Sequence, residues 1–254
     1  MSATQQDYVA GQYAPRAEDY VTSLVHRSGD DLDQIETEVR GHAHAHVLDL
    51  GCGGGHVSYR AAPHVASVVA CDVTQAMLDV VARTAAERGL SNITTQQAAA
   101  EHLPFAHASF DLVLSRFTTH HWHNMEAGLR EARRVLKPDH RAVFIDVIAP
   151  ADPLLDTHLQ TVELLRDVSH VRDYAMVQWV GALARAGFVL NGVTNRRLFM
   201  DFPVWIARTR TPPAHAAAIR SLQQGAPPSV KAHFEISDSG GFFLDVATML
   251  ARAA

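Results

Sequence analysis

With 254 residues, the chain is long enough for one large α/β domain with its own core. Apolar residues make up 47% and charged residues 19%, as in soluble globular proteins, and a net charge of −5 with no Lys/Arg-rich run argues against nucleic acid as a partner. The polar N-terminus does not resemble a signal peptide, and no apolar run reaches the roughly 18 residues of a membrane helix. We therefore expect a cytoplasmic protein, a monomer or homodimer that does not bind membranes.

Strands and helices are expected to alternate after His46. Runs rich in Val, Ile and Leu, or in β-branched residues, predict strands at 46–50, 67–72, 92–95, 110–115 and 142–148. Apolar residues at helical spacing predict helices at 55–62, 76–88 and 126–137. This alternation predicts a mostly parallel sheet with helices on both faces.

The pattern changes after Pro150, where helices outnumber strands. Helices are expected at 152–169, 175–186, 205–209 and 214–224, and a strand at 188–193. The segments 234–237 and 242–247 flank the turn sequence DSGG and are expected to form strands, the last of them antiparallel to the sheet. We divide the chain into a helical cap (1–40), a ligand-binding core (41–150) and a region that completes the sheet and covers a substrate pocket (151–254).

The sharpest motif is VLDLGCGGGHV at 47–57, a strand followed by a glycine loop and a helix. Glycines there permit positive φ and let a ligand approach the backbone. The dinucleotide fingerprint requires a sixth-position glycine, which is His56 here, so a nicotinamide-dependent oxidoreductase is disfavoured.

Two carboxylates accompany this loop. Asp72 ends the second strand, at a suitable distance to bind both hydroxyls of a ribose, and Asp49 precedes the loop, where it favours an ammonium group. A ligand with a ribose and an amino-acid part but no phosphate fits both positions. S-adenosylmethionine is such a ligand, with S-adenosylhomocysteine as the product of methyl transfer.

These motifs resemble those of a known family. VLDLGCGGG, ACD, AEHLPFAHASFDLVLSRFTTHHW and LREARRVLKPDHRAVFIDV are similar to the class I S-adenosylmethionine-dependent methyltransferases, in particular to the methyltransferase type 11 group that includes ubiquinone/menaquinone C-methyltransferases. The resemblance implies a Rossmann-like seven-stranded sheet ordered 3-2-1-4-5-7-6, with strand 7 antiparallel and helices on both faces.

The resemblance also implies which residues bind the cofactor. In chain order they are Asp49, Gly51, Gly53 and Gly55 at the methionine part, with Cys52 in the same loop, Asp72 at the ribose, Val73 and Met77 on the adenine, Ala100 and Glu101 at its edge, and Ser115 and Arg116 near the sulfonium or carboxylate. One position departs from the family. Ala99 stands where an aspartate often accepts from the adenine amino group, so backbone groups or Glu101 must replace it.

The histidine-rich stretch SRFTTHHWH at 115–123 then falls at the carboxyl end of the fourth strand, where ligands bind in open α/β sheets. His121, and after it His120, are candidate bases for the acceptor, and Asp146 is a candidate to orient one of them. Packing under the loop is the alternative role. No metal site is predicted, because adjacent histidines point in different directions on a regular backbone.

The acceptor pocket is the least defined part. The candidates to line it are Trp122, Trp179, Phe199, Phe202 and Trp205, together with Arg166, His170, Arg172 and Arg208. The N-terminal segment is a candidate lid, with Tyr20 or His26 touching the cofactor. We expect a methyltransferase acting on a small molecule. The alternatives are an enzyme that uses S-adenosylmethionine for other chemistry, such as cyclisation of its aminobutyl arm or a lyase reaction, and a non-catalytic protein that binds it.

Overall fold

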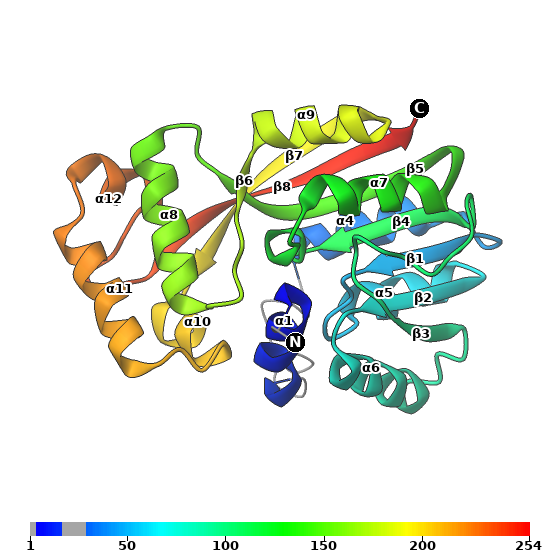
Figure 1. The fold of residues 1–254 in the computed structure, drawn as a ribbon, viewed down its shortest axis with the longest axis horizontal. Helices are drawn as coiled ribbons and strands as arrows, with labels where there is room; N and C mark the ends of the chain where they lie inside the picture. Colours follow the sequence, from blue (N-terminus) through cyan, green and yellow to red (C-terminus); the bar gives the residue numbers. More distant parts are fainter. Residues whose placement is uncertain (1–3, 17–28) are drawn as a thin grey trace.

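The computed structural model describes residues 4–16 and 29–254. Its centre is a twisted sheet whose strands follow the order β3-β2-β1-β4-β5-β8-β7, with a short strand β6 beside β5 (Figure 1). The strands are β1 (His46–Leu50), β2 (Ser67–Asp72), β3 (Ile93–Gln97), β4 (Phe110–Arg116), β5 (Leu136–Ala149), β6 (Tyr174–Ala175), β7 (Phe188–Met200) and β8 (Phe242–Ala253).

The first five strands run parallel and the last long strand reverses direction. Pairings β1–β2, β2–β3, β1–β4 and β4–β5 are all parallel, whereas β8 lies antiparallel between β5 and β7. The predicted fold class is therefore confirmed, and the path of seven strands follows the expected order. The difference is the two-residue strand β6, which adds an eighth strand and pairs with β5 at Ile148 and Ala149.

Helices cover both faces of the sheet. One face carries α4 (Asp30–Val39), α5 (His56–Ala61) and α6 (Gln75–Glu87), and the other carries α7 (Met125–Val135) and α9 (Met176–Ala186). Neighbouring residues of β1 show the division, because Val47 packs on the first face and Leu48 on the second. Strands buried on both faces explain the near-continuous apolar runs of the sequence.

The remaining helices gather at one end of the molecule, around the ends of β7 and β8 (Figure 1). They are α8 (Pro153–Arg166), α10 (Phe202–Arg208), α11 (Pro213–Gly225) and α12 (Pro228–Phe234). Asp152 starts α8 by accepting the backbone N–H groups of Leu154 and Leu155. The N-terminal helix α1 (Gln5–Tyr13) lies between this helical end and the rest of the sheet (Figure 1). Within the described ranges, none of the helices combines the length and apolar character of a membrane span.

Several predicted elements have other bounds in the structure, and two of the differences have a local cause. The helix expected over 126–137 ends at Val135, and Leu136 already belongs to β5, because Pro138 favours an extended conformation in the residue before it. The strand expected at 234–237 is absent. Phe234 ends α12, and Glu235 adopts a left-handed conformation with φ of 50°, so β8 pairs with β5 and β7 instead of forming a hairpin.

Candidate functional site

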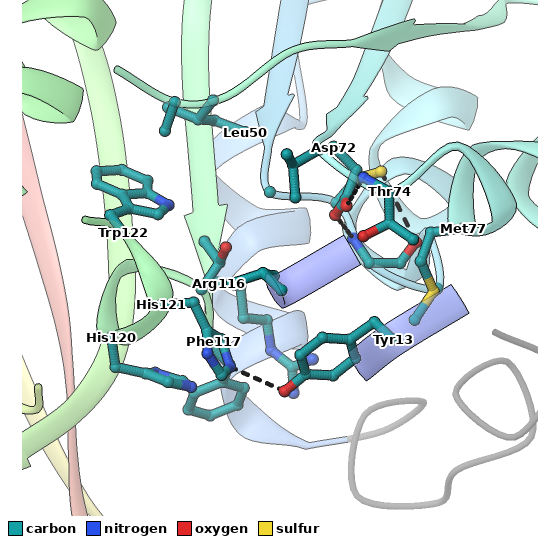
Figure 2. A pocket seen from close by; sticks show the side chains of 18 of the residues that line it. Tyr13, Leu50, Asp72, Thr74, Met77, Arg116, Phe117, His120, His121 and Trp122 are labelled. Carbon is teal, nitrogen blue, oxygen red and sulfur yellow. Dashed lines mark hydrogen bonds between the residues drawn. The ribbon is translucent and has the colours of Figure 1, made fainter. Parts of the chain in front are cut away.

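A large cavity opens at the carboxyl ends of the central strands. It has a volume of about 1490 Å³, including solvent at its mouth. It is lined by the last residues of three strands, Leu50 of β1, Asp72 of β2 and Arg116 of β4, and by Val147 within β5. Figure 2 shows Asp72 and Met77 on one side of this cavity and His120, His121 and Trp122 on the other. We call the first side the cofactor half and the second the acceptor half.

The glycine loop forms the floor of the cofactor half. The backbone N–H groups of Gly51 and Cys52 donate to the Cys71 carbonyl, which fastens the loop to β2. Gly51 has φ of 73°, and a Cβ there would lie 2.2–2.7 Å from atoms of Thr118. A side chain at Gly51 would therefore strain the backbone and collide with the loop that carries the histidines.

Asp72 is oriented by the backbone around it. Its Oδ2 accepts the N–H of Gly53 at 2.9 Å, and its Oδ1 accepts the N–H of Thr74 at 2.9 Å (Figure 2). Burial raises the pKa of this carboxyl, although the backbone hydrogen bonds oppose the shift. Each oxygen keeps a lone pair for a ligand hydroxyl, so the side chain is a fixed acceptor at the edge of the cavity.

Asp49 has one oxygen that is satisfied and one that is not. Ser58 donates to Oδ2 through its backbone N–H at 3.0 Å and its hydroxyl at 2.6 Å. Oδ1 is buried and has no hydrogen-bond partner among the described residues, although Asp49 lines the cavity. Burial raises the pKa of Asp49 to about 7. A buried carboxylate oxygen of this kind requires a donor, and a ligand ammonium would supply one.

The other predicted cofactor residues fall into two groups. Those that line the cavity are Gly51, Cys52, Gly53, Val73, Met77, Ala100, Glu101 and Arg116. Gly55 does not line it, because it packs against Tyr59 and Val81. Ser115 does not, since side chains alternate along β4 and Arg116 is the one that faces the cavity. The Ser115 hydroxyl is buried without a hydrogen-bond partner in the described part of the chain. Tyr20 and His26 lie outside the described residues.

Ala99 lines the cavity beside Ala98 and Ala100, so this stretch presents mainly backbone groups to a ligand. Glu101 is buried, and its Oε1 accepts the backbone N–H of Asn124 at 3.2 Å. The backbone therefore has to supply most of the polar contacts at this edge. Burial raises the pKa of the Cys52 thiol well above its usual range and that of Cys71 to about 12, which keeps both thiols protonated.

His120 is the better-placed of the two histidines. Its Nδ1–H donates to Asp146 Oδ1 at 2.7 Å, so Asp146 does orient a histidine, as its position at the end of the strand suggested. Asp146 is fixed in turn by the backbone N–H groups of Thr119 and Val147. Burial opposes a charge on His120, but the Asp146 carboxylate outweighs it and raises the pKa of His120 to about 9. This leaves Nε2 as the ring nitrogen available to a ligand.

His121 has both ring nitrogens engaged. Nε2 lies 2.9 Å from the Tyr13 hydroxyl (Figure 2). This hydroxyl donates to Asp167 Oδ2 at 2.6 Å, and Nδ1 of His121 lies 3.2 Å from the Ser169 carbonyl. Burial, followed by the charge of His120, lowers the pKa of His121 to about 4. The neutral ring can donate through only one nitrogen, but protein atoms stand within hydrogen-bond distance of both, so the geometry favours His120 over His121 as a base.

The contacts of His121 also bring the N-terminal helix over the cavity. Gln5, Gln6, Val9 and Tyr13 of α1 all line it, and Gln5 Nε2 donates to the Ser169 carbonyl at 3.1 Å. Sequence reasoning selected Tyr20 for this part and missed Tyr13. No local signal distinguishes the two tyrosines, because the contact depends on residues more than 100 positions away.

The predicted acceptor-pocket residues divide in the same way. Trp122, Arg166, Trp205 and Arg208 line the cavity. The others do not: Trp179 is buried against Phe144, Phe199 is 51% exposed, and Phe202, His170 and Arg172 lie outside the lining. Val147, Leu198, Met200 and Leu244 complete an apolar wall.

A group of acidic residues in the acceptor half was not foreseen. Asp173 and Glu163 line the cavity, and ligand-type atoms of His120, Asp146 and Asp173 all lie within 4.8 Å of one another. Three such atoms resemble a metal site, which the sequence did not predict. However, Asp146 already accepts three hydrogen bonds, one of them from His120, and a metal ion between the two would have to break that bond.

The strand order, the glycine loop and the carboxylate at the end of β2 together define a class I methyltransferase. The comparisons agree, and the chain belongs to the methyltransferase family: residues 48–144 match the family model described as "Methyltransferase domain". The chain is 34% identical to the uncharacterized methyltransferase YcgJ of Bacillus subtilis over 200 residues, 79% of each protein.

Two further likenesses extend over most of the chain. Uncharacterized protein YafE of Escherichia coli is 44% identical over 204 residues, which cover 80% of this chain and 99% of the relative. The crystal structure of YcgJ superposes with a TM-score of 0.85 at 29% identity, covering 88% of this chain and 98% of that one. The relationship therefore extends beyond the segment that the family model matches.

Proposed function

We propose that this chain transfers the methyl group of S-adenosylmethionine to a small-molecule acceptor. The observation that carries the proposal is the pair of carboxylates at the cofactor half, Asp49 with its unpartnered Oδ1 and Asp72 held by two backbone N–H groups. They fit a ligand with an ammonium at one end and a ribose further along. When bound, S-adenosylmethionine supplies a methyl carbon that its sulfonium already activates.

The residues around this pair fit the same ligand. The backbone of Gly51 and Gly53 leaves room where a side chain would intrude, and Val73 and Met77 offer apolar surface for a base. Asp72 would accept from the ribose hydroxyls and Asp49 from the methionine ammonium. The chain's part in catalysis is to hold donor and acceptor in line and to exclude water.

A small acceptor is supported by how the cavity is enclosed. Helix α1 lies over it through Tyr13 and Gln5, and α8 and α10 contribute Arg166 and Trp205 to the far wall. An acceptor bound there would lie beside His120, whose Nε2 would take its proton while Asp146 stabilises the resulting imidazolium. We also propose a reducing compartment, the cytoplasm, which is consistent with Cys52 and Cys71 being free thiols.

Calorimetric titration with S-adenosylhomocysteine tests the cofactor assignment. We expect Asp72→Ala to weaken binding by about 1.5–3 kcal/mol, roughly 10–150-fold in Kd, because charge-assisted hydrogen bonds to the ribose are lost. Asp79→Ala, which removes an exposed carboxylate from α6, is the matched control and should bind normally. Unchanged affinity in Asp72→Ala would refute the ribose role, and no heat with the wild-type protein would refute the function.

The spent cofactor separates the remaining alternatives. S-adenosylhomocysteine as the product, detected by mass spectrometry, supports methyl transfer, whereas methylthioadenosine indicates chemistry on the aminobutyl arm. Binding with no turnover across a broad panel of small acceptors would favour a non-catalytic binder.

A further inference from the structure

Asp173 is the buried group that the proposed reaction has not yet used. It lies just before β6, next to β5, and lines the acceptor half although it is only 2% exposed. Its Oδ2 has no hydrogen-bond partner among the described residues. A buried, unsatisfied carboxylate oxygen costs free energy and persists in native proteins where a ligand or a function accounts for it.

The charges around Asp173 leave it without a counter-ion. Asp146 is paired with His120 at 2.7 Å, and Glu163 is paired with Arg166 at 3.2 Å. Burial raises the pKa of Asp173 well above its usual range; Glu163 and Asp146 add to this shift, while His120 and Arg166 oppose it from beyond ion-pair distance. Without a ligand, Asp173 therefore keeps its proton, and a cation bound beside it would favour release of that proton and formation of the carboxylate.

His170 does not supply the missing charge. Its Nε2 lies 3.8 Å from Asp173 Oδ2 but donates to Gln160 Oε1 at 3.1 Å. The amide of Gln160 is fixed in this orientation, because its Nε2 donates to the Asp173 carbonyl and its Oε1 also accepts the Asp173 N–H. Burial lowers the pKa of His170, which keeps the ring neutral.

On the basis of the function proposed above, we infer that Asp173 binds the cationic nitrogen of the acceptor, which is a small amine carrying an apolar group. Ligand-type atoms of His120 and Asp173 lie within 4.8 Å of each other but form no ion pair of 4.0 Å or less in the described chain. A ligand nitrogen that enters this gap would lie close to both side chains. The apolar wall of Val147, Met200 and Leu244 would receive the rest of the molecule.

In the proposed methyl transfer to the amine, every proton and electron pair is accounted for by the groups present. The ammonium, held by the Asp173 carboxylate, gives one proton to the neutral Nε2 of His120, and the amine lone pair forms the N–C bond as the C–S bond breaks. The bond pair goes to sulfur, the methylated ammonium and S-adenosylhomocysteine leave, and His120 returns its proton to solvent. A histidine with a pKa of about 9 is well matched to an alkylammonium, whose pKa is about 10, so the proton transfer is nearly isoenergetic.

The test uses the full chain saturated with S-adenosylhomocysteine and two probes of the same shape, benzylammonium and benzyl alcohol. Benzylammonium is expected to raise the Tm of the wild-type complex by about 2–4 °C at roughly ten times its Kd, and benzyl alcohol is not. Asp173→Asn should lose the amine response, whereas Asp238→Asn, at an exposed carboxylate outside the cavity lining, should retain it. With S-adenosylmethionine, mass spectrometry should detect methylated benzylamine from the wild-type protein, reduced at least tenfold in Asp173→Asn.

The outcomes separate this inference from the function on which it depends. A response to the alcohol but not the amine, an equal amine response in Asp173→Asn, or no response to either probe while S-adenosylhomocysteine still stabilises the protein would overturn the role of Asp173 alone. Failure of S-adenosylhomocysteine to stabilise the wild-type protein would instead overturn the proposed function.

Discussion

Replacing His120 with glutamine is expected to lower kcat about 10²–10⁴-fold with any acceptor that the wild-type protein methylates, while S-adenosylhomocysteine affinity stays unchanged. The reason is that His120 combines a ring nitrogen directed to the acceptor half with a fixed partner, Asp146, at 2.7 Å. Glutamine keeps hydrogen-bonding capacity but cannot take up a proton. The measurement is the initial rate of S-adenosylhomocysteine formation at saturating cofactor.

The pH dependence gives a second reading of the same residue. His120 becomes a base only after losing its own proton, so kcat/KM for the acceptor should rise with pH and level off above an apparent pKa at or below about 9. The positive charge of a bound sulfonium would lower this apparent pKa. The His120→Gln variant should lack this rise of kcat/KM with pH.

Two control variants make the assignment specific. His121→Gln should retain most of the turnover and mainly loosen α1, because both nitrogens of His121 are used by Tyr13 and Ser169. His107→Gln, at an exposed position outside the cavity lining, should behave like the wild-type protein. If His121→Gln loses turnover and His120→Gln does not, the roles of the two histidines are reversed.

The second large effect is expected at Asp49, where stability and binding should change in opposite directions. Its folded-state pKa of about 7 lies above the ordinary value of 3.8, so the ligand-free protein loses stability as pH rises from about 4 to 7. Above pH 7 the loss in free energy of unfolding approaches about 4 kcal/mol, since each pKa unit corresponds to roughly 1.4 kcal/mol. Asp49→Asn removes the buried charge while its side-chain oxygen still accepts from Ser58.

We therefore expect ligand-free Asp49→Asn to unfold at a higher temperature than the wild-type protein at pH 8, by several degrees, and to show a smaller difference at pH 5. The same variant should bind S-adenosylhomocysteine about 10–150-fold more weakly, because the group facing the ligand ammonium becomes an N–H donor. Thermal unfolding at the two pH values, with and without S-adenosylhomocysteine, measures both effects.

Asp238→Asn, which removes an exposed carboxylate far along the chain, is the charge-matched control and should change neither property. If Asp49→Asn were less stable than the wild-type protein at pH 8 without ligand, the Asp49 charge would already be compensated inside the protein. The unpartnered Oδ1 would then give no support to an ammonium site.

The cofactor half could be predicted from the sequence because its residues lie at or just after the ends of strands. Gly51 and Gly53 directly follow β1, and Asp72 is the last residue of β2. Parallel strands bring such ends together at one edge of the sheet, so adjacent strands place these residues in one cavity without further information. Ser115 shows the limit of this reasoning, since a one-residue step along β4 decides which face a side chain occupies.

The acceptor half was harder to predict from the sequence, because its contacts join segments that are far apart in the chain. The choice between His120 and His121 depends on Asp146 from β5, Tyr13 from α1 and Ser169 after α8, and adjacent histidines carry no local signal that separates them. The contact between Tyr13 and Asp167 spans 154 positions. Sequence reasoning named candidate arginines and aromatics there, and only some of them line the cavity.

By itself, the sequence determined the sheet, its family and the position of the glycine loop, because apolar periodicity and strand-end residues are local properties. Only the tertiary structure decided which histidine keeps a ring nitrogen for the acceptor and that Asp173 lies beside it without a counter-ion. Burial and pairing are set by the packing of distant elements, and these two quantities control the charge of an ionisable group.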